Sequence, residues 1–258
     1  MNKFSATVII FLLISITALP QEESSFYDAP FGGGIGYIGG WIFPKVYGIN
    51  SELQNFGVSK FPTTGFYTSG GTGFIYLGII KNFRIGGVGF GGSFSTSGNS
   101  KEVFPPGIYG APSKIVLVNN EAVYSLKGGG ITIEYTIPYV RNFGISIGAL
   151  IGRGSLNIEL YRNVGGKSWQ SYWNDASKYP SANFSSTLLN NYWIFTPMLN
   201  IDIPAYHLLC FRVGAGYQIT FGSKWTYDNN QVLAGAPSNI NGDSLYLQAG
   251  VLIGIFSF

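Results

Sequence analysis

Eight apolar or alternating segments run through this chain, and the connections between them are alternately long and short. The segments lie at residues 31–44, 65–80, 83–97, 123–139, 143–161, 191–204, 208–225 and 243–258. The short connections are 81–82, 140–142 and 205–207, and the long polar ones are 45–64, 98–122, 162–190 and 226–242. This rhythm predicts an all-β fold, an up-and-down antiparallel transmembrane β-barrel of eight strands with short periplasmic turns and four long external loops.

Residues within the segments alternate between apolar and polar types. In 209–221 the odd positions are apolar, whereas the even positions include Arg212 and Gln218. Because successive strand residues point to opposite faces, one face is apolar and the other is polar or small. Segments 131–139 and 193–203 repeat the pattern. In 143–161 the apolar face changes from odd to even positions, which predicts a one-residue β-bulge near 152–154.

Composition favours membrane strands over membrane helices. Charged residues make up 10% of the 258 residues, against roughly 25% in an ordinary soluble domain. After residue 20 no apolar run approaches the roughly 18 residues of a membrane helix. The formal net charge is +3, with no stripe of basic residues, so no nucleic-acid partner is expected.

The two ends of the chain carry targeting and closure signals. Residues 1–21 are predicted to be a secretory signal peptide, because Lys3 precedes an apolar core at 8–16. Residues 22–258 are then expected to form a single barrel domain, whose last segment pairs with 31–44. The odd residues of 243–258 make the cleaner lipid face. That phase would turn Phe256 and Phe258 inward, unless a bulge or the end of the strand intervenes.

The signal sequence, the eight segments, the loop rhythm and the terminal Phe258 together resemble small eight-stranded outer-membrane β-barrel proteins of Gram-negative-type bacteria. The resemblance covers nearly the whole mature chain and is architectural. The family's C-terminal sorting pattern places a glycine five residues before the final aromatic, where this chain has Ile253, with Gly254 one position later. The resemblance implies a bacterial outer-membrane location, contact with outer-membrane lipids, and recognition by the barrel-assembly machinery through the strand ending at Phe258.

Motifs for catalysis, cofactors and metals are weak. The G-x-G-x-x-G match at 34–39 continues as strand and not as a helix, so no cofactor is expected. His207, the only histidine, is predicted to lie in a periplasmic turn, and Cys210 is the only cysteine, which excludes the usual transition-metal sites. The carboxylates and amides within 228–243 lack the spacing of a calcium loop. No catalytic site and no metal site are therefore predicted.

Polar residues on the inward positions form the strongest constellation. They are Glu134, Arg153, Asn157, Glu159, Asp202, Arg212 and Lys224. Ionisable groups at membrane depth normally pair with one another, and Asp202 and Arg212 are predicted to form a diagonal pair across one turn. Because eight strands leave an interior just wide enough for side chains, a plugged lumen is favoured over a polar conduit.

The long loop at 162–190 is rich in aromatic residues. They are Trp169, Tyr172, Trp173, Tyr179 and Phe184. Since Trp and Tyr are effective interface anchors, this loop is a candidate contact surface for a protein partner, a glycan or lipopolysaccharide. The alternative is that the aromatic residues cap the barrel or extend its strands.

These observations predict a structural or surface-interaction role, such as adhesion or binding, without catalysis. Three alternatives remain open. A narrow small-solute channel would depend on Glu134 or Arg212. A lipid-modifying enzyme would need a hydroxyl or carboxylate partner for His207. The chain is also compatible with a subunit of a larger envelope machine.

Overall fold

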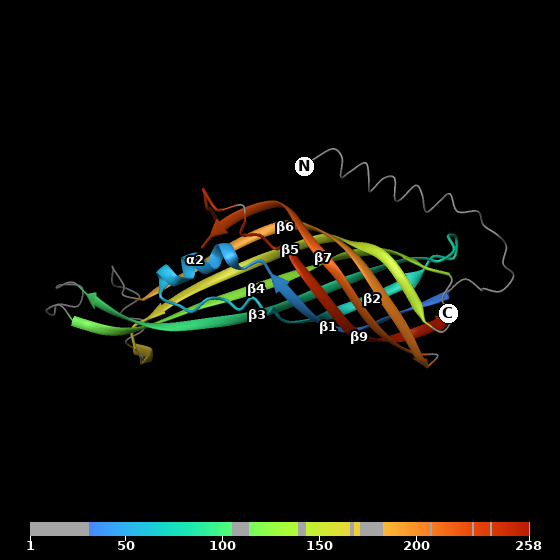
Figure 1. Cartoon of the computed structure of the whole chain (residues 1–258), viewed down its shortest axis with the longest axis horizontal. Helices are drawn as coiled ribbons and strands as arrows, with labels where there is room; N and C mark the ends of the chain where they lie inside the picture. Colours follow the sequence, from blue (N-terminus) through green and yellow to red (C-terminus); the bar gives the residue numbers. More distant parts are fainter. Residues whose placement is uncertain are drawn as a thin grey trace.

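The computed structural model describes residues 31–104, 114–138, 143–165, 168–170, 183–206, 208–228, 230–237 and 239–257. The predicted signal peptide at 1–21 lies outside this described part. The described chain is mostly β-strand, and its strands curl into one elongated barrel (Figure 1).

Eight long strands form the ring. They are β1 (Phe31–Pro44), β2 (Phe66–Tyr76), β3 (Phe83–Phe104), β4 (Lys114–Thr136), β5 (Gly144–Asn163), β6 (Phe184–Tyr206), β7 (Leu209–Tyr227) and β9 (Ser244–Ser257). Each strand pairs antiparallel with its neighbours, and β9 pairs with β1 from Phe31↔Ser257 to Pro44↔Ser244. The ring is therefore closed. The short β8 (Gln231–Val232) pairs with β7 alone. The prediction of an eight-stranded up-and-down barrel closed by the last segment is confirmed.

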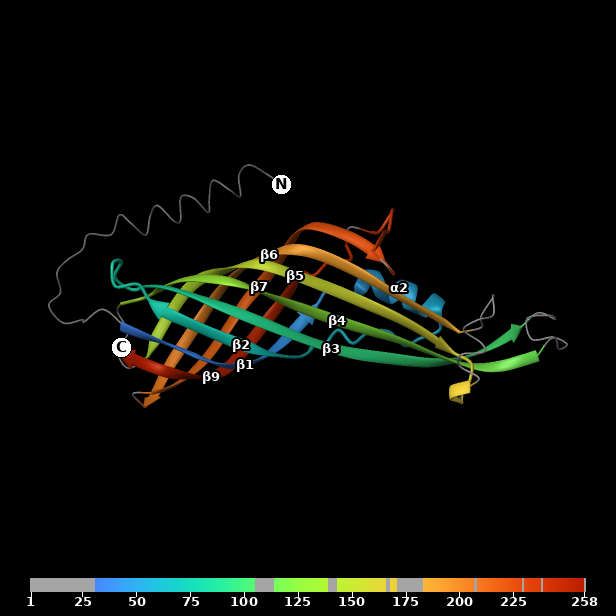
Figure 2. The same cartoon turned by 180° about the vertical axis from the view of Figure 1, so that it is seen from behind.

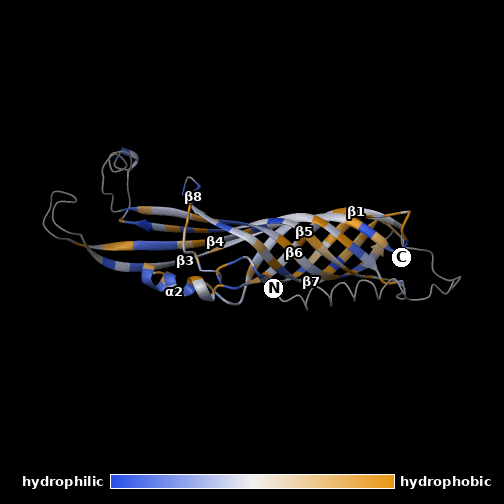
Figure 3. Cartoon of the chain, turned by 90° about the horizontal axis from the view of Figure 1, so that it is seen from above, coloured by the Kyte–Doolittle hydropathy of each residue, from blue (hydrophilic) through white to orange (hydrophobic). Residues whose placement is uncertain are grey.

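The outer face of the barrel is apolar near the end that carries the short turns, which we call the turn end. Every strand of the ring contributes exposed aliphatic side chains there. They include Ile35, Ile75, Ile85, Ile133, Ile147, Leu199, Val213 and Ile253. Figure 3 shows this surface as orange segments over the part of the barrel near the C-terminus. A closed barrel leaves no unpaired backbone toward lipid, so this surface, the apolar belt, suits a bilayer.

Four strands continue beyond the apolar belt at the opposite end, the loop end (Figures 1 and 2). Strands β3, β4, β5 and β6 have 22, 23, 20 and 23 residues, whereas a membrane crossing needs about 9–11. On β4 the outward residues change from Ile131 to Lys127, and on β6 from Trp193 to Asn191. We call the parts beyond this line, residues 92–104, 114–127, 155–163 and 184–191, the outer sheet.

The inner face of the outer sheet is apolar and packs on the first long loop. Buried Tyr124, Leu156 and Ile158 share one hydrophobic core with Leu53 and Phe61 from that loop. Leu53 lies on α2 (Tyr47–Phe56), a ten-residue helix without a side-chain N-cap. Because so short a helix is marginal alone, packing on the sheet stabilises it. No helix in the described residues is long and apolar enough to cross a membrane.

One sequence-based expectation about irregularity is wrong. No bulge interrupts β5, because its register with β4 runs unbroken from Thr136↔Ser146 to Asn119↔Asn163. The apolar residues change parity there because the strand leaves the apolar belt, and its inner face becomes the apolar one. A register shift lies instead between β6 and β7, beside Gly222, whose φ is +67°.

The second long connection is also shorter than expected. Most of 98–122 is strand, since β3 extends to Phe104 and β4 begins at Lys114. The two strands pair directly along this length, which satisfies their backbone hydrogen-bonding groups above the bilayer. Polar side chains alone therefore did not reveal that these residues continue the barrel wall.

Candidate functional site

Four charged side chains meet inside the barrel near the turn end. They are Arg84 from β3, Glu134 from β4, Asp202 from β6 and Arg212 from β7, and each is at most 2% exposed. Strand register sets them in two directly opposed pairs, Arg84 with Glu134 and Asp202 with Arg212. We call these four residues the lumen network.

Hydrogen bonds join the two pairs into one unit. Arg212 binds Asp202 through two bonds, Nε to Oδ1 at 2.7 Å and Nη2 to Oδ2 at 3.1 Å. Arg84 donates from Nε to Glu134 Oε2 at 3.0 Å, and its Nη1 binds Asp202 on the other side of the lumen. Two arginines thus balance two carboxylates, which is how ionisable groups are tolerated at membrane depth.

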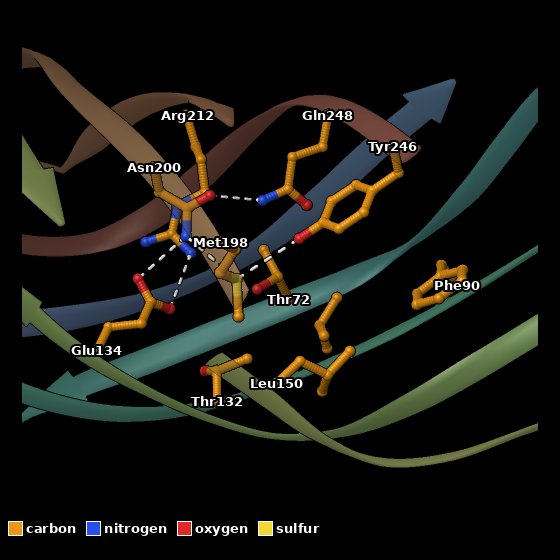
Figure 4. Close-up of a pocket in the computed structure, with 11 residues that line it drawn as sticks. Thr72, Phe90, Thr132, Glu134, Leu150, Met198, Asn200, Arg212, Tyr246 and Gln248 are labelled. Carbon is orange, nitrogen blue, oxygen red and sulfur yellow. Dashed lines mark hydrogen bonds and ion pairs between the residues drawn. The ribbon is translucent and has the colours of Figure 1, made fainter. Parts of the chain in front are cut away.

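Neutral side chains form further hydrogen bonds around the lumen network. Ser146 Oγ and Asn200 Nδ2 donate to Glu134 Oε2 at 3.0 and 3.1 Å. Gln248 Nε2 donates to Asn200 Oδ1 at 2.7 Å. These bonds connect the network to β5 and β9 as well, so it joins strands from most of the ring. Figure 4 shows the part around Glu134, Asn200, Arg212 and Gln248.

An apolar cluster lies beside the lumen network. It consists of Phe74, Tyr76, Cys210, Leu252 and Phe256. The guanidinium groups of Arg84 and Arg212 lie 4.3 and 4.6 Å from the centre of the Phe74 ring. Phe256 faces inward and contacts Phe74, which agrees with the phase of the odd-residue lipid face. Phe258 lies outside the described residues.

Sequence reasoning located part of the lumen network. Glu134, Asp202 and Arg212 face the lumen, and Asp202 and Arg212 pair directly opposite each other, not diagonally. Arg84 was missed, although it occupies an inward position between the apolar Phe83 and Ile85. This alternation of apolar and polar residues along β3 was the sequence signal that could have placed Arg84 in the lumen.

The sequence predicts that Arg153 and Glu159 lie in the lumen, but in the structure both face outward on β5. Arg153 stacks 4.3 Å from the ring centre of outward-facing Trp193. Glu159 accepts hydrogen bonds from Asn157 Nδ2, at 2.7 Å, and from Tyr161 on the same strand. The prediction was wrong because it placed a bulge in β5 that does not exist.

A small cavity adjoins the lumen network on its loop side (Figure 4). It has a volume of about 20 Å³ and is lined by polar Glu134, Asn200 and Arg212 and by apolar Leu150 and Met198. A buried water needs roughly 10–15 Å³ of such space. The cavity therefore has room for about one water molecule.

The described surface beyond the apolar belt carries exposed apolar side chains. On the outer sheet Ile115 is 67% and Leu117 is 56% exposed, and in the β5–β6 loop Trp169 is 77% exposed. Of the other predicted loop aromatics, Phe184 begins β6 and lies near Phe56 of α2. Tyr172, Trp173 and Tyr179 lie outside the described residues.

Residues considered for metal binding or catalysis have other roles or lie outside the description. Asp243 accepts hydrogen bonds from the backbone and hydroxyl of Thr220, at 2.8 and 2.7 Å. Asp228 accepts one from the backbone of Thr187. No group of three or more metal-ligating side chains gathers among the residues that the structure describes. His207 is not among them.

No protein-family model matches the sequence, and no curated protein matches it. Several solved structures are similar to the chain at low identity. Ail, the attachment invasion locus protein of Yersinia pestis, is 9% identical, with a TM-score of 0.33 over 88% of this chain and 99% of that chain. A major outer membrane protein from Thermus thermophilus is 8% identical, with a TM-score of 0.44 over 86% and 99%. OprG from Pseudomonas aeruginosa is 10% identical, with a TM-score of 0.36 over 89% and 95%.

Proposed function

We propose that this chain, a small outer-membrane β-barrel protein, is a non-catalytic surface-contact protein whose barrel anchors a folded outer part. One observation carries the proposal. Strands β3–β6 run far past the apolar belt and pack, with α2 and the first loop, around a hydrophobic core that continues into the barrel. A chain that only crossed the membrane would not need strands of 20–23 residues.

The interior supports an anchoring role over a channel. The lumen network and its neighbouring apolar cluster fill the turn end of the barrel. An eight-stranded barrel has little spare interior, and the adjoining cavity has a volume of only about 20 Å³. Rigid internal packing of this kind suits a fixed support for an outer domain.

The outer part offers features that suit binding. Ile115, Leu117 and Trp169 present exposed apolar side chains to the exterior, and Trp is a frequent anchor residue at interfaces. Beyond Gly91 the edge of β3 has no paired strand among the described elements. Contact with a surface ligand or protein partner through these side chains is the function that we infer.

Surface binding tests the proposal directly. The chain is displayed on a non-adherent bacterial host, and cells are assayed on a panel of glycans and extracellular proteins. We expect binding to at least one surface, with at least tenfold loss in the Trp169→Ala, Leu117→Ser double variant. Heat-dependent gel mobility should stay unchanged in that variant, because both side chains lie outside the barrel core. Equal binding by both forms, or binding by neither, would overturn the proposal.

Export and assembly belong to the same proposal. Residues 1–21 would direct secretion and be removed, and the strand ending at Phe258 would be recognised by the barrel-assembly machinery. Deleting 1–21 should keep the chain in the cytoplasm. Replacing Phe258 with Ser should lower the amount of folded protein in the outer-membrane fraction.

A further inference from the structure

Basic side chains gather on the outer wall of the barrel, at the line where the apolar belt ends. One row of cross-strand pairs joins Lys127 to Ser155, Ser155 to Asn191, and Asn191 to Lys224. Since neighbouring strands lie about 4.8 Å apart, this row spans roughly 14 Å. Arg153 faces the same way on β5, two residues nearer the belt than Ser155.

The irregularity in β7 brings Lys224 into this row. Up to Phe221 the odd residues of β7 face outward. The shift beside Gly222 reverses the parity, so that Lys224 shares the outer face with Asn191 while buried Trp225 turns inward beside Asn190. The positive φ of Gly222 is one that other residues rarely adopt. The sequence-based placement of Lys224 in the lumen was wrong for this reason.

An open hollow of about 460 Å³ lies among these side chains. Its lining residues are Phe90, Lys127, Gly128, Arg153, Gly154, Ser155 and Asn191. Ser155 is only 6% exposed, and its Oγ has no hydrogen-bond partner among the described residues. A buried hydroxyl without a partner is unusual, because burial without a hydrogen bond is costly. The site therefore offers an unused donor next to two cations, Lys127 and Arg153.

We propose that this hollow binds the phosphorylated headgroup of a lipid in the outer leaflet. A phosphate carries negative charge and accepts hydrogen bonds, and ammonium, guanidinium, hydroxyl and amide groups are suitable donors to it. Lys127 and Arg153 line the hollow and supply charge, and Ser155 and Asn191 supply neutral donors. Lys224 adds charge beside the hollow, on the strand next to Asn191.

The position beside the belt selects a lipid as the source of the phosphate. Trp193 lies opposite Arg153, and Phe221 lies opposite Trp193. Aromatic residues of barrel proteins mark the membrane–water interface, so the hollow lies at headgroup depth. A lipid seated there would lay its acyl chains along the exposed Ile151 and Ile219.

The acidic groups on the outward faces of β4 and β5 lie farther out. Glu159 is four residues beyond Ser155 on β5, roughly 13 Å along the strand, and it is hydrogen-bonded to Asn157 and Tyr161. Glu121 faces Tyr161 on the neighbouring strand, farther still. The charge at the hollow is therefore positive, and this conclusion does not depend on the proposed contact role of the outer sheet.

Lipid binding by the purified full chain in neutral detergent tests the inference. The probes are diphosphoryl lipid A and the same lipid after enzymatic removal of its phosphates. The test variant is Lys127→Gln, Arg153→Gln, Lys224→Gln. The matched control, Lys60→Gln, Lys81→Gln, Lys101→Gln, removes the same charge from other exposed positions.

A basic residue near an anionic headgroup contributes roughly fivefold in affinity. We expect the test variant to bind diphosphoryl lipid A about a hundredfold more weakly than the wild type, and the control to bind within about threefold. Ser155→Ala should weaken binding severalfold, with heat-dependent gel mobility unchanged in all variants. Equal loss in test and control variants, or equal binding of the dephosphorylated lipid, would overturn the site. Displacement of lipid A by millimolar inorganic phosphate would overturn the lipid as its ligand.

Discussion

Arg84 on β3 and Asp202 on β6 form an ion pair across the barrel interior, between residues 118 positions apart on strands that are not neighbours. Arg84 also binds Glu134 on the adjacent β4, and Asp202 also binds Arg212 on the adjacent β7. One guanidinium thus joins two cross-strand pairs, so the lumen network acts as a single cross-brace.

Removing Arg84 tests the cross-brace. In Arg84→Met, Glu134 and Asp202 stay buried with one arginine between them. Breaking a buried ion pair from one side typically costs about 3–5 kcal/mol, and we expect the free energy of unfolding to fall by about that amount. Urea unfolding in lipid vesicles, followed by gel mobility, measures it. Lys81→Met, at an exposed position, should change it by less than about 0.5 kcal/mol, and a similarly small loss for Arg84→Met would contradict the cross-brace.

The depth of the apolar belt can be measured along a single face of β4. Ile133 lies in the belt, whereas Ser125, eight residues away on the same outward face, lies on the outer sheet. A lysine on the lipid face near the bilayer centre costs about 2–4 kcal/mol, so Ile133→Lys should lower unfolding stability by that amount. Ser125→Lys should cost less than about 0.5 kcal/mol. Equal costs at the two positions would place the boundary elsewhere.

Alternation in the sequence was sufficient to predict the ring of strands, its closure and most inward charges. It assigns each residue to one of two faces, and Glu134, Asp202 and Arg212 followed from it. Alternation cannot say which face should be apolar, since that depends on whether lipid or water lies outside. On β5 the apolar face is outward at Ile151 and inward at Leu156, without any backbone irregularity.

The other differences between the sequence-based predictions and the structure have separate causes. The shift beside Gly222 turns Lys224 outward, and glycine is frequent in this chain, so no single glycine marks such a site. Helix α2 has no side-chain cap and no acidic residue in its first turn. It is stabilised by contacts of Ile49 and Leu53 with strands distant in sequence, which a local pattern does not reveal.

The attachment of α2 to the outer sheet should be separable from the barrel. Leu53 is 1% exposed, and replacing a buried leucine with alanine typically costs about 2–5 kcal/mol. We expect Leu53→Ala to release the first loop to protease in intact vesicles, with cleavage at least tenfold faster. Gel mobility of the barrel should stay heat-dependent. Glu52→Ala, an exposed neighbour on α2, is the control, and no change in the cleavage rate of Leu53→Ala would refute independent docking.

Tyr124 gives the outer core a dependence on alkaline pH. Burial raises the pKa of Tyr124 well above its usual value, so the folded core favours the neutral phenol. The resulting stability is fully present below the unfolded-state pKa of about 10 and declines as the pH rises above it. Protease release of the first loop should therefore accelerate between about pH 10 and 11.

Tyr124→Phe isolates that effect. The Tyr124 hydroxyl has no hydrogen-bond partner among the described residues, so its removal should leave the cleavage rate at pH 8 within about twofold of the wild type. The variant should lose most of the acceleration above pH 10, because phenylalanine does not ionise. If wild type and variant accelerate equally, another group controls the alkaline loosening, and the buried phenol does not limit the stability of the outer core.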